Sequence, residues 1–284
     1  MKQLFTGFVA LLLAGCTHVG LELANLPAKF STTRLYKDVD YGALPVQKLD
    51  IYVPQLDRQG PLPVVVFFYG GRWSDGSKEM YPFVAEAFAE HGYVTVIADY
   101  SKYPQVRFPA FIEDGAKAVA WVHRHIHDYG GNPERLFLAG HSSGAHIGAL
   151  LAADERYLSA EGLSSDVIKA FAGLAGPYDF IPQAEDLKQI FGPPERYPQM
   201  QVPTFIDGGE PPMLLMWGEE DQAVWRRNMD RLSATIREQE GRVETRIYPG
   251  LDHVGVIASL TWFLRGQRPV YADILSFFEK HRTP

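Results

Sequence analysis

One pentapeptide constrains the fold of this chain more than any other feature. Gly140-His141-Ser142-Ser143-Gly144 lies directly between a strand-like run, RLFLA, and a helix-like run, AHIGALLAA. A serine between small residues in a strand-to-helix turn has a sharp, strained backbone, and the turn presents its hydroxyl at the carboxyl edge of a sheet. Glycine-serine-glycine spacing alone also occurs in ordinary tight turns, but here both flanking elements are present. We therefore interpret Ser142 as a nucleophile.

Short β-rich and helical runs alternate along the chain from residue 34 onward. The expected strands cover 34–39, 47–53, 62–69, 93–98, 135–139, 168–174, 213–217 and 243–248, and the expected helices cover 81–90, 108–129, 146–153, 224–239 and 270–280. This alternation predicts a mostly parallel sheet of the eight-stranded type with helices on both faces. Together with the serine turn, it is typical of the α/β-hydrolase fold. The proline-rich segment 178–212, with a short helix near 184–190, is expected to be a small insertion between strands six and seven.

A serine hydroxyl needs a general base, and in this fold the base comes last in the chain order of serine, acid and histidine. Three histidines follow the serine: His146, His253 and His281. His146 lies in the helix that follows the serine turn, and His281 lies in a charged tail. His253 directly follows the last expected strand, at the carboxyl edge of the sheet. The sequence therefore predicts His253 as the base.

The acid that orients this histidine is expected after the preceding strand, which ends at Trp217. Glu219, Glu220 and Asp221 are all candidates there, and the same residues also fit an exposed acidic loop. Asp221 is favoured because a strand, a glycine, two residues and then aspartate match the usual loop length of this fold. Asp252 adjoins His253 in sequence, so its side chain is expected to diverge from the imidazole.

Acyl transfer also needs donors for the oxyanion that develops on the substrate. A glycine pair, Gly70-Gly71, follows the expected strand 62–69 at the position that this fold uses, and glycine lets the backbone approach a carbonyl closely. The amides of Gly70, Gly71 and Ser143 are therefore the predicted oxyanion hole. We expect no metal site, because His123 and His127, one helical turn apart, lack a third ligand.

Four motifs resemble one group of small esterases. YGGRW, GHSSGAH, WGEED and GLDHVG, within residues 45–282, are similar to hormone-sensitive-lipase-like carboxylesterases, kynurenine formamidases and isoprenylcysteine methylesterases. The resemblance implies an acyl-enzyme mechanism without a metal or organic cofactor. These relatives usually carry a histidine that holds the oxyanion loop where this chain has Tyr69, which puts loop geometry and substrate range in question.

The resemblance leaves three functions open. The favoured function is hydrolysis of carboxylic esters, and the alternative is cleavage of amides, such as formamidase activity. The third possibility is an inactive, lipid-anchored binding protein of the cell envelope. The small insertion predicts a short-chain acyl preference. Residues 254–269, apolar at several positions, are expected to add one wall to the site.

The N-terminus has the pattern of a bacterial lipoprotein signal. Lys2 precedes an apolar run, 8–14, that is too short to span a bilayer, and the run leads into Leu13-Ala14-Gly15-Cys16. We expect 1–15 to be a signal peptide, Cys16 to be lipidated, 16–33 to be a tether and 34–284 to be the catalytic domain. Thr17 after the cysteine is similar to the outer-membrane sorting state, which predicts an envelope protein facing the periplasm. The alternative is an ordinary secretory signal with a chance cysteine.

Charge and cysteine content limit the partners. The 284 residues have a formal net charge of −7 and no long basic run, which argues against nucleic acid as a partner. Cys16 is the single cysteine, so disulfides are not expected to stabilise the fold. The expected partners are a small ester substrate and, through Cys16, a membrane.

Overall fold

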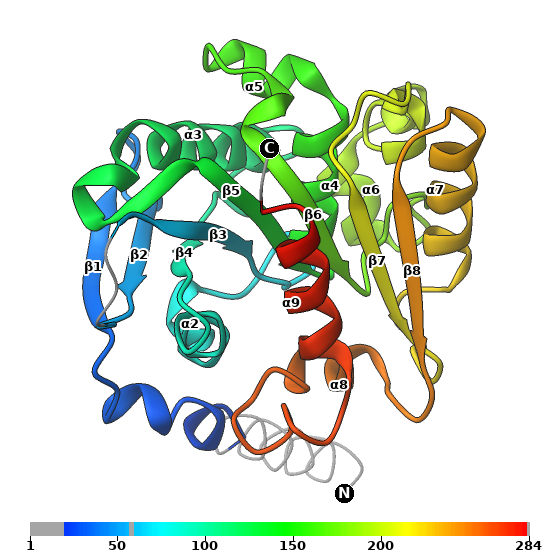
Figure 1. The fold of residues 1–284 in the computed structure, drawn as a ribbon. Helices are drawn as coiled ribbons and strands as arrows, with labels where there is room; N and C mark the ends of the chain where they lie inside the picture. Colours follow the sequence, from blue (N-terminus) through cyan, green and yellow to red (C-terminus); the bar gives the residue numbers. More distant parts are fainter. Residues whose placement is uncertain (1–19, 57–59, 283–284) are drawn as a thin grey trace, which may run out of the picture.

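Eight strands form one sheet in the computed structural model, which describes residues 20–56 and 60–282 (Figure 1). The strands are β1 (Arg34–Asp40), β2 (Lys48–Val53), β3 (Leu62–Phe68), β4 (Val94–Ala98), β5 (Gly131–His141), β6 (Ile168–Leu174), β7 (Met213–Gly218) and β8 (Val243–Tyr248). Their order is β1-β2-β4-β3-β5-β6-β7-β8. β2 pairs antiparallel with β1 and β4, and all later pairs are parallel. The predicted α/β-hydrolase sheet is confirmed.

Helices cover both faces of the sheet. α2 (Pro82–Ala89) and α9 (Val270–Lys280) share one face, where the rings of Phe88 and Phe278 stack at 6.2 Å. The other face carries α3 (Ala110–His125), α4 (Ser143–Ala153) and α7 (Arg227–Glu238) (Figure 1). Every residue of α4 is buried, which explains why its sequence is apolar and small on all sides. None of the helices within the described residues is long and apolar enough to cross a bilayer.

The strand order determines where a ligand site can form. The chain passes from β3 to β4 on one side and then to β5 on the other side, so the direction of winding reverses beside β3. In open α/β sheets, ligands bind outside the carboxyl ends of the strands at such a reversal. The glycine pair after β3 and the serine after β5 both lie at this place.

Several elements differ from the sequence prediction. The long helix expected over 108–129 ends at His125 and continues as a 3-10 turn to Tyr129, and Gly130 then adopts a left-handed conformation with φ 79°. β5 is longer than predicted at both ends. Two short helices were missed, α5 (Glu155–Ala160) and α8 (His253–Ala258), because six-residue helices carry too little periodicity to be detected.

The segment Tyr178–Pro212 leaves the sheet between β6 and β7, as expected. It contains α6 (Glu185–Phe191) and two 3-10 turns, Pro194–Gln199 and Val202–Phe205. Trp73 attaches the segment to the domain, because its ring stacks on Phe180 at 5.7 Å and meets the edge of Phe191 at 4.8 Å. The Arg72 guanidinium adds two bonds to the Asp186 carboxylate, of 2.5 and 3.0 Å. The insertion is therefore anchored to the loop that follows β3.

Residues 20–33 precede the sheet and lie against α2. Residues 20–24 are helical, and a 3-10 turn covers Pro27–Lys29. Residues 1–15, Cys16 and 17–19 lie outside the described residues, so the expected signal peptide and lipidation site have no structural description.

Candidate active site

The turn between β5 and α4 holds Ser142 in a strained conformation. Its φ is 54° and its ψ is −124°, a region that non-glycine residues rarely occupy. A Cβ on Gly140 would lie 2.5 Å from the carbonyl oxygen of Gly144, and a Cβ on Gly144 would lie 2.0 Å from the carbonyl oxygen of Phe68. Both glycines are therefore required by backbone contact. The second contact also joins the serine turn to the end of β3.

This contact predicts a large loss of stability for Gly144→Ala. The added methyl group meets fixed backbone rather than a movable side chain, so we expect the free energy of unfolding to fall by about 3 kcal/mol. Chemical denaturation measures the change. Gly266→Ala is the control, because a Cβ there has no neighbour within 4 Å. Equal effects of the two substitutions would contradict the packing argument.

Ser142, His253 and Asp221 form one chain of hydrogen bonds. The Ser142 hydroxyl donates to Nε2 of His253 at 2.9 Å, and Nδ1 of His253 donates to Oδ2 of Asp221 at 2.8 Å. The neighbouring Glu219 and Glu220 are exposed. Of the three acidic candidates, the structure thus brings Asp221 to the imidazole.

The Asp221 carboxylate is buried, and both of its oxygens accept hydrogen bonds. Its Oδ1 accepts the backbone amides of Ala223 and Val224, each at 2.8 Å. Burial raises the pKa of Asp221, but the hydrogen bonds from His253 and from these amides outweigh it and lower the pKa below its ordinary value. Asp221 therefore stays ionised at neutral pH, and it can stabilise a positive charge on His253.

His253 is the first residue of helix α8, which follows β8. The side chain of Asp252 caps this helix by accepting the amide of Gly255 at 2.6 Å, which turns it away from the imidazole as predicted. Nε2 of His141 donates to the carbonyl oxygen of His253 at 3.0 Å. Burial, with the nearby His253, lowers the pKa of His141 to about 3, so His141 is a neutral support for the base.

Two of the three predicted oxyanion donors, Gly70 and Ser143, lie beside the serine, and Gly71 lines the cavity over it. Gly70 faces the serine so closely that a Cβ on Gly70 would lie 3.0 Å from Cβ of Ser142. Ser143 is the first residue of α4, where the amide has no partner within the helix. Within the described residues, none of the turn and loop hydrogen bonds is donated by the amides of Gly70, Gly71 or Ser143. These amides are suited to binding a negative oxygen.

Tyr69 occupies the position of the relatives' histidine and has its own set of contacts. Its hydroxyl donates to Asp99 at 2.5 Å and accepts from Lys102 at 2.8 Å. Its ring stacks between Tyr81 and Tyr100, and Tyr100 donates to the Tyr69 carbonyl oxygen. The loop that follows Tyr69 is thereby attached to buried groups by side chains other than a histidine.

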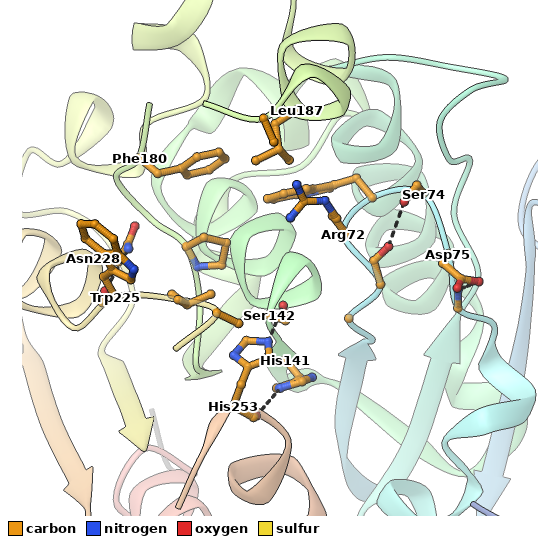
Figure 2. Close-up of a pocket in the computed structure, with 18 of the residues that line it drawn as sticks. Arg72, Ser74, Asp75, His141, Ser142, Phe180, Leu187, Trp225, Asn228 and His253 are labelled. Atoms are coloured by element: carbon orange, nitrogen blue, oxygen red, sulfur yellow. Dashed lines mark hydrogen bonds between the residues drawn. The ribbon is translucent and has the colours of Figure 1, made fainter. Parts of the chain in front are cut away.

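An open cavity of about 960 Å³ lies over Ser142 (Figure 2). The insertion contributes Phe180 and Leu187 to one wall, the loop after β3 contributes Arg72 and Ser74, and Trp225 lies at the rim (Figure 2). Trp73 lines the cavity too but is buried, whereas Trp217 packs nearby and donates to the carbonyl oxygen of Val224 at 2.8 Å.

Other sequence candidates lie elsewhere. No residue of 254–269 lines the cavity described here, so the expected apolar wall is wrong; α8 turns this segment away from the site. His146 is buried and bonds to the carbonyl oxygen of Met200 at 2.8 Å, so we assign it a structural role. Among the described residues, no group of three or more His, Cys, Asp or Glu side chains is arranged to hold a metal ion.

The sheet, the serine turn and the hydrogen-bonded chain define a protein of the α/β-hydrolase fold. Solved structures agree on the fold. A carbohydrate esterase from gut microbiota matches with a TM-score of 0.77 at 19% identity, covering 88% of this chain and 97% of that one. Esterase B from Lactobacillus rhamnosis matches with a TM-score of 0.78 at 17% identity, covering 98% and 96%.

Comparison of the chain with protein-family models identifies its family. The chain belongs to the BD-FAE family, whose model matches residues 49–236. This span contains Ser142 and Asp221 and ends before His253, so the position of His253 rests on geometry.

Curated relatives are esterases of greater length. A probable isoprenylcysteine alpha-carbonyl methylesterase from Arabidopsis thaliana is 27% identical over 79% of this chain and 52% of its own length. Esterase LipQ from Mycobacterium tuberculosis is 30% identical over 76% of this chain and 57% of its own. The chain thus spans about half the length of these relatives.

Proposed function

We propose that this protein is a serine hydrolase that cleaves carboxylic esters through Ser142, His253 and Asp221. The observation that carries the proposal is the continuous hydrogen-bonded chain from the Ser142 hydroxyl to the Asp221 carboxylate. Beside it lie three amides that donate none of the turn and loop hydrogen bonds found in residues 20–56 and 60–282. The esterase relatives support ester substrates. An inactive binding protein would not need this complete arrangement.

The geometry supports a two-step reaction. His253 accepts the Ser142 proton as the hydroxyl attacks the ester carbonyl, and Asp221 holds the imidazole tautomer and stabilises its charge. The amides of Gly70, Gly71 and Ser143 bind the oxyanion. His253 then protonates the leaving alcohol, and water attacks the acyl-enzyme by the same route to release the acid.

Two assays test the proposal. A fluorophosphonate probe should label Ser142, with the modified peptide identified by mass spectrometry, and a p-nitrophenyl butyrate assay should show turnover. Comparison with the matching p-nitroanilide separates ester from amide cleavage. Absence of both labelling and turnover would refute the proposal, and faster anilide cleavage would favour the amide alternative.

We also propose a preference for short acyl chains, which the lining of the cavity supports. The insertion contributes Phe180 and, from the seven-residue α6, Leu187, and polar Arg72 and Ser74 share the lining. A long chain would leave many methylenes in water and gain little from binding. We expect kcat/KM for acetyl to butyryl p-nitrophenyl esters to exceed that for the palmitoyl ester by at least about tenfold. A rise towards long chains would contradict this expectation.

The envelope location is a separate proposal that rests on the sequence around Cys16. Acylation requires the thiol, so Cys16→Ser should leave an unprocessed precursor or release the protein from membranes. Fractionation of the bacterial envelope after detergent-free lysis measures this. Wild-type protein found wholly in the soluble fraction would refute the lipid anchor.

A further inference from the structure

The arm formed by residues 20–30 carries large apolar side chains on its outer side. Leu23, Leu26 and Phe30 are spaced three and four residues apart along a nearly helical backbone, and all three are exposed, Phe30 at 82%. This spacing places them along one side of the arm. Ala24, between them in sequence, is buried.

The arm is fastened to the domain. The Asn25 side chain donates to the carbonyl oxygen of Met80 at 3.2 Å and accepts the amide of Phe83 at 2.9 Å. Nε1 of Trp262 donates to the carbonyl oxygen of Leu23 at 3.1 Å, so the segment around Trp262 lies beside the arm (Figure 1). Trp262 is itself 45% exposed. We call Leu23, Leu26, Phe30 and Trp262 the arm surface.

The chemistry of the arm surface fits a lipid interface. Glu22 and Lys29, charged side chains of the arm, pair with each other at 2.6 Å, so their charges cancel. Clustered exposed apolar side chains mark interaction sites, and tryptophan, with its amphipathic ring, is enriched at membrane–water interfaces. Leucine and phenylalanine next to tryptophan are the side chains by which peripheral segments enter the boundary between headgroups and acyl chains.

The position of Cys16 selects a membrane over a protein partner. Gly20 lies four positions after Cys16, a distance of at most about 14 Å for an extended chain. An acylated Cys16 would therefore keep the arm within reach of the bilayer. Docking then becomes an intramolecular step at high effective concentration, for which a small apolar surface suffices.

We propose that the arm surface docks on the bilayer in which Cys16 is anchored. Leu23, Leu26 and Phe30 enter the interface, and Trp262 lies at its edge. The proposal rests on the lipid anchor and is independent of the proposed esterase activity. Because Asn25 bonds to Met80, and Met80 lines the cavity, docking holds one rim of the active site close to the lipid surface.

Tryptophan quenching tests the proposal. The full chain, produced with its own N-terminal segment in a bacterial host, is reconstituted into phosphatidylcholine vesicles with brominated acyl chains, which quench nearby indoles. We expect quenching that Trp262→Phe largely removes and Trp225→Phe retains. Trp225 is the matched control because it is more exposed, at 65%, but lies on the loop between β7 and α7.

A second comparison changes the surface itself. Leu26→Ser with Phe30→Ser should lower the docked-to-undocked ratio by about tenfold or more, while the anchor keeps the protein on the vesicles. Leu44→Ser is the control, since Leu44 is as exposed as Leu26 but lies at the opposite end of β1 from the arm.

Four outcomes would overturn or support the proposal. Vesicle-bound protein whose quenching is unchanged by Trp262→Phe would overturn it while leaving the anchor intact. Protein that does not associate with vesicles would overturn both. Unquenched protein that forms dimers by light scattering would assign the arm surface to a second copy. Intact quenching without hydrolysis of p-nitrophenyl butyrate would support docking and refute the esterase function.

Discussion

Replacement of Ser142 by alanine should lower kcat on p-nitrophenyl butyrate by about 10⁵-fold or more, because the proposed acyl-enzyme forms on its hydroxyl. The hydroxyl makes its hydrogen bond to His253, and alanine adds no atoms to the strained turn. We therefore expect the melting temperature to stay close to that of the wild type. Fluorophosphonate labelling should be lost together with turnover.

The control for this substitution is Ser159→Ala, an exposed serine on α5. It should retain wild-type turnover and labelling. A Ser142→Ala enzyme that keeps most of its activity would show that the nucleophile lies elsewhere.

Asp221→Asn should lower kcat by about 10⁴-fold. The amide side chain cannot stabilise a charged imidazole as a carboxylate does, and it favours the wrong tautomer of His253. The two backbone amides that bond to Oδ1 can still bond to the asparagine oxygen, so the loop should keep its conformation. Steady-state kinetics on the same ester, with a melting curve, measures both effects.

The chain provides two matched controls for Asp221. Glu219→Gln and Glu220→Gln make the same change of charge at exposed positions one and two residues away, and each should leave kcat within about twofold of the wild type. If either glutamate variant were more damaged than Asp221→Asn, the acid would have to be reassigned to that position.

The sheet and the serine turn were predictable because both depend on local patterns. Buried parallel strands are continuous apolar runs, and Gly140 and Gly144 mark backbone contacts that no other residue allows. The acid was harder to assign, because three consecutive acidic residues share one loop. Which of them faces the imidazole depends on a few backbone dihedral angles and on the amides of Ala223 and Val224.

Contacts between distant segments could not be predicted from the sequence. The bond from His141 to the carbonyl oxygen of His253 joins residues far apart in the chain and has no periodic signature. The same holds for Tyr69, whose partners Asp99 and Lys102 follow a different strand. The wall expected from 254–269 was wrong because apolar composition shows that a segment is packed, without showing what it packs against.

The division between the sheet and its insertion has a consequence for how the specificity of the proposed esterase can change. Ser142, His253 and Asp221 all follow strands of the sheet, whereas Phe180 and Leu187 belong to a segment that contributes none of them. Substitutions at cavity-lining positions such as Ile181 and Leu187 can therefore alter what binds above Ser142, whereas Phe180, Asp186 and Met200 also hold Trp73, Arg72 and His146 in place. A library restricted to such cavity-lining positions is the starting point for directed evolution of new specificities.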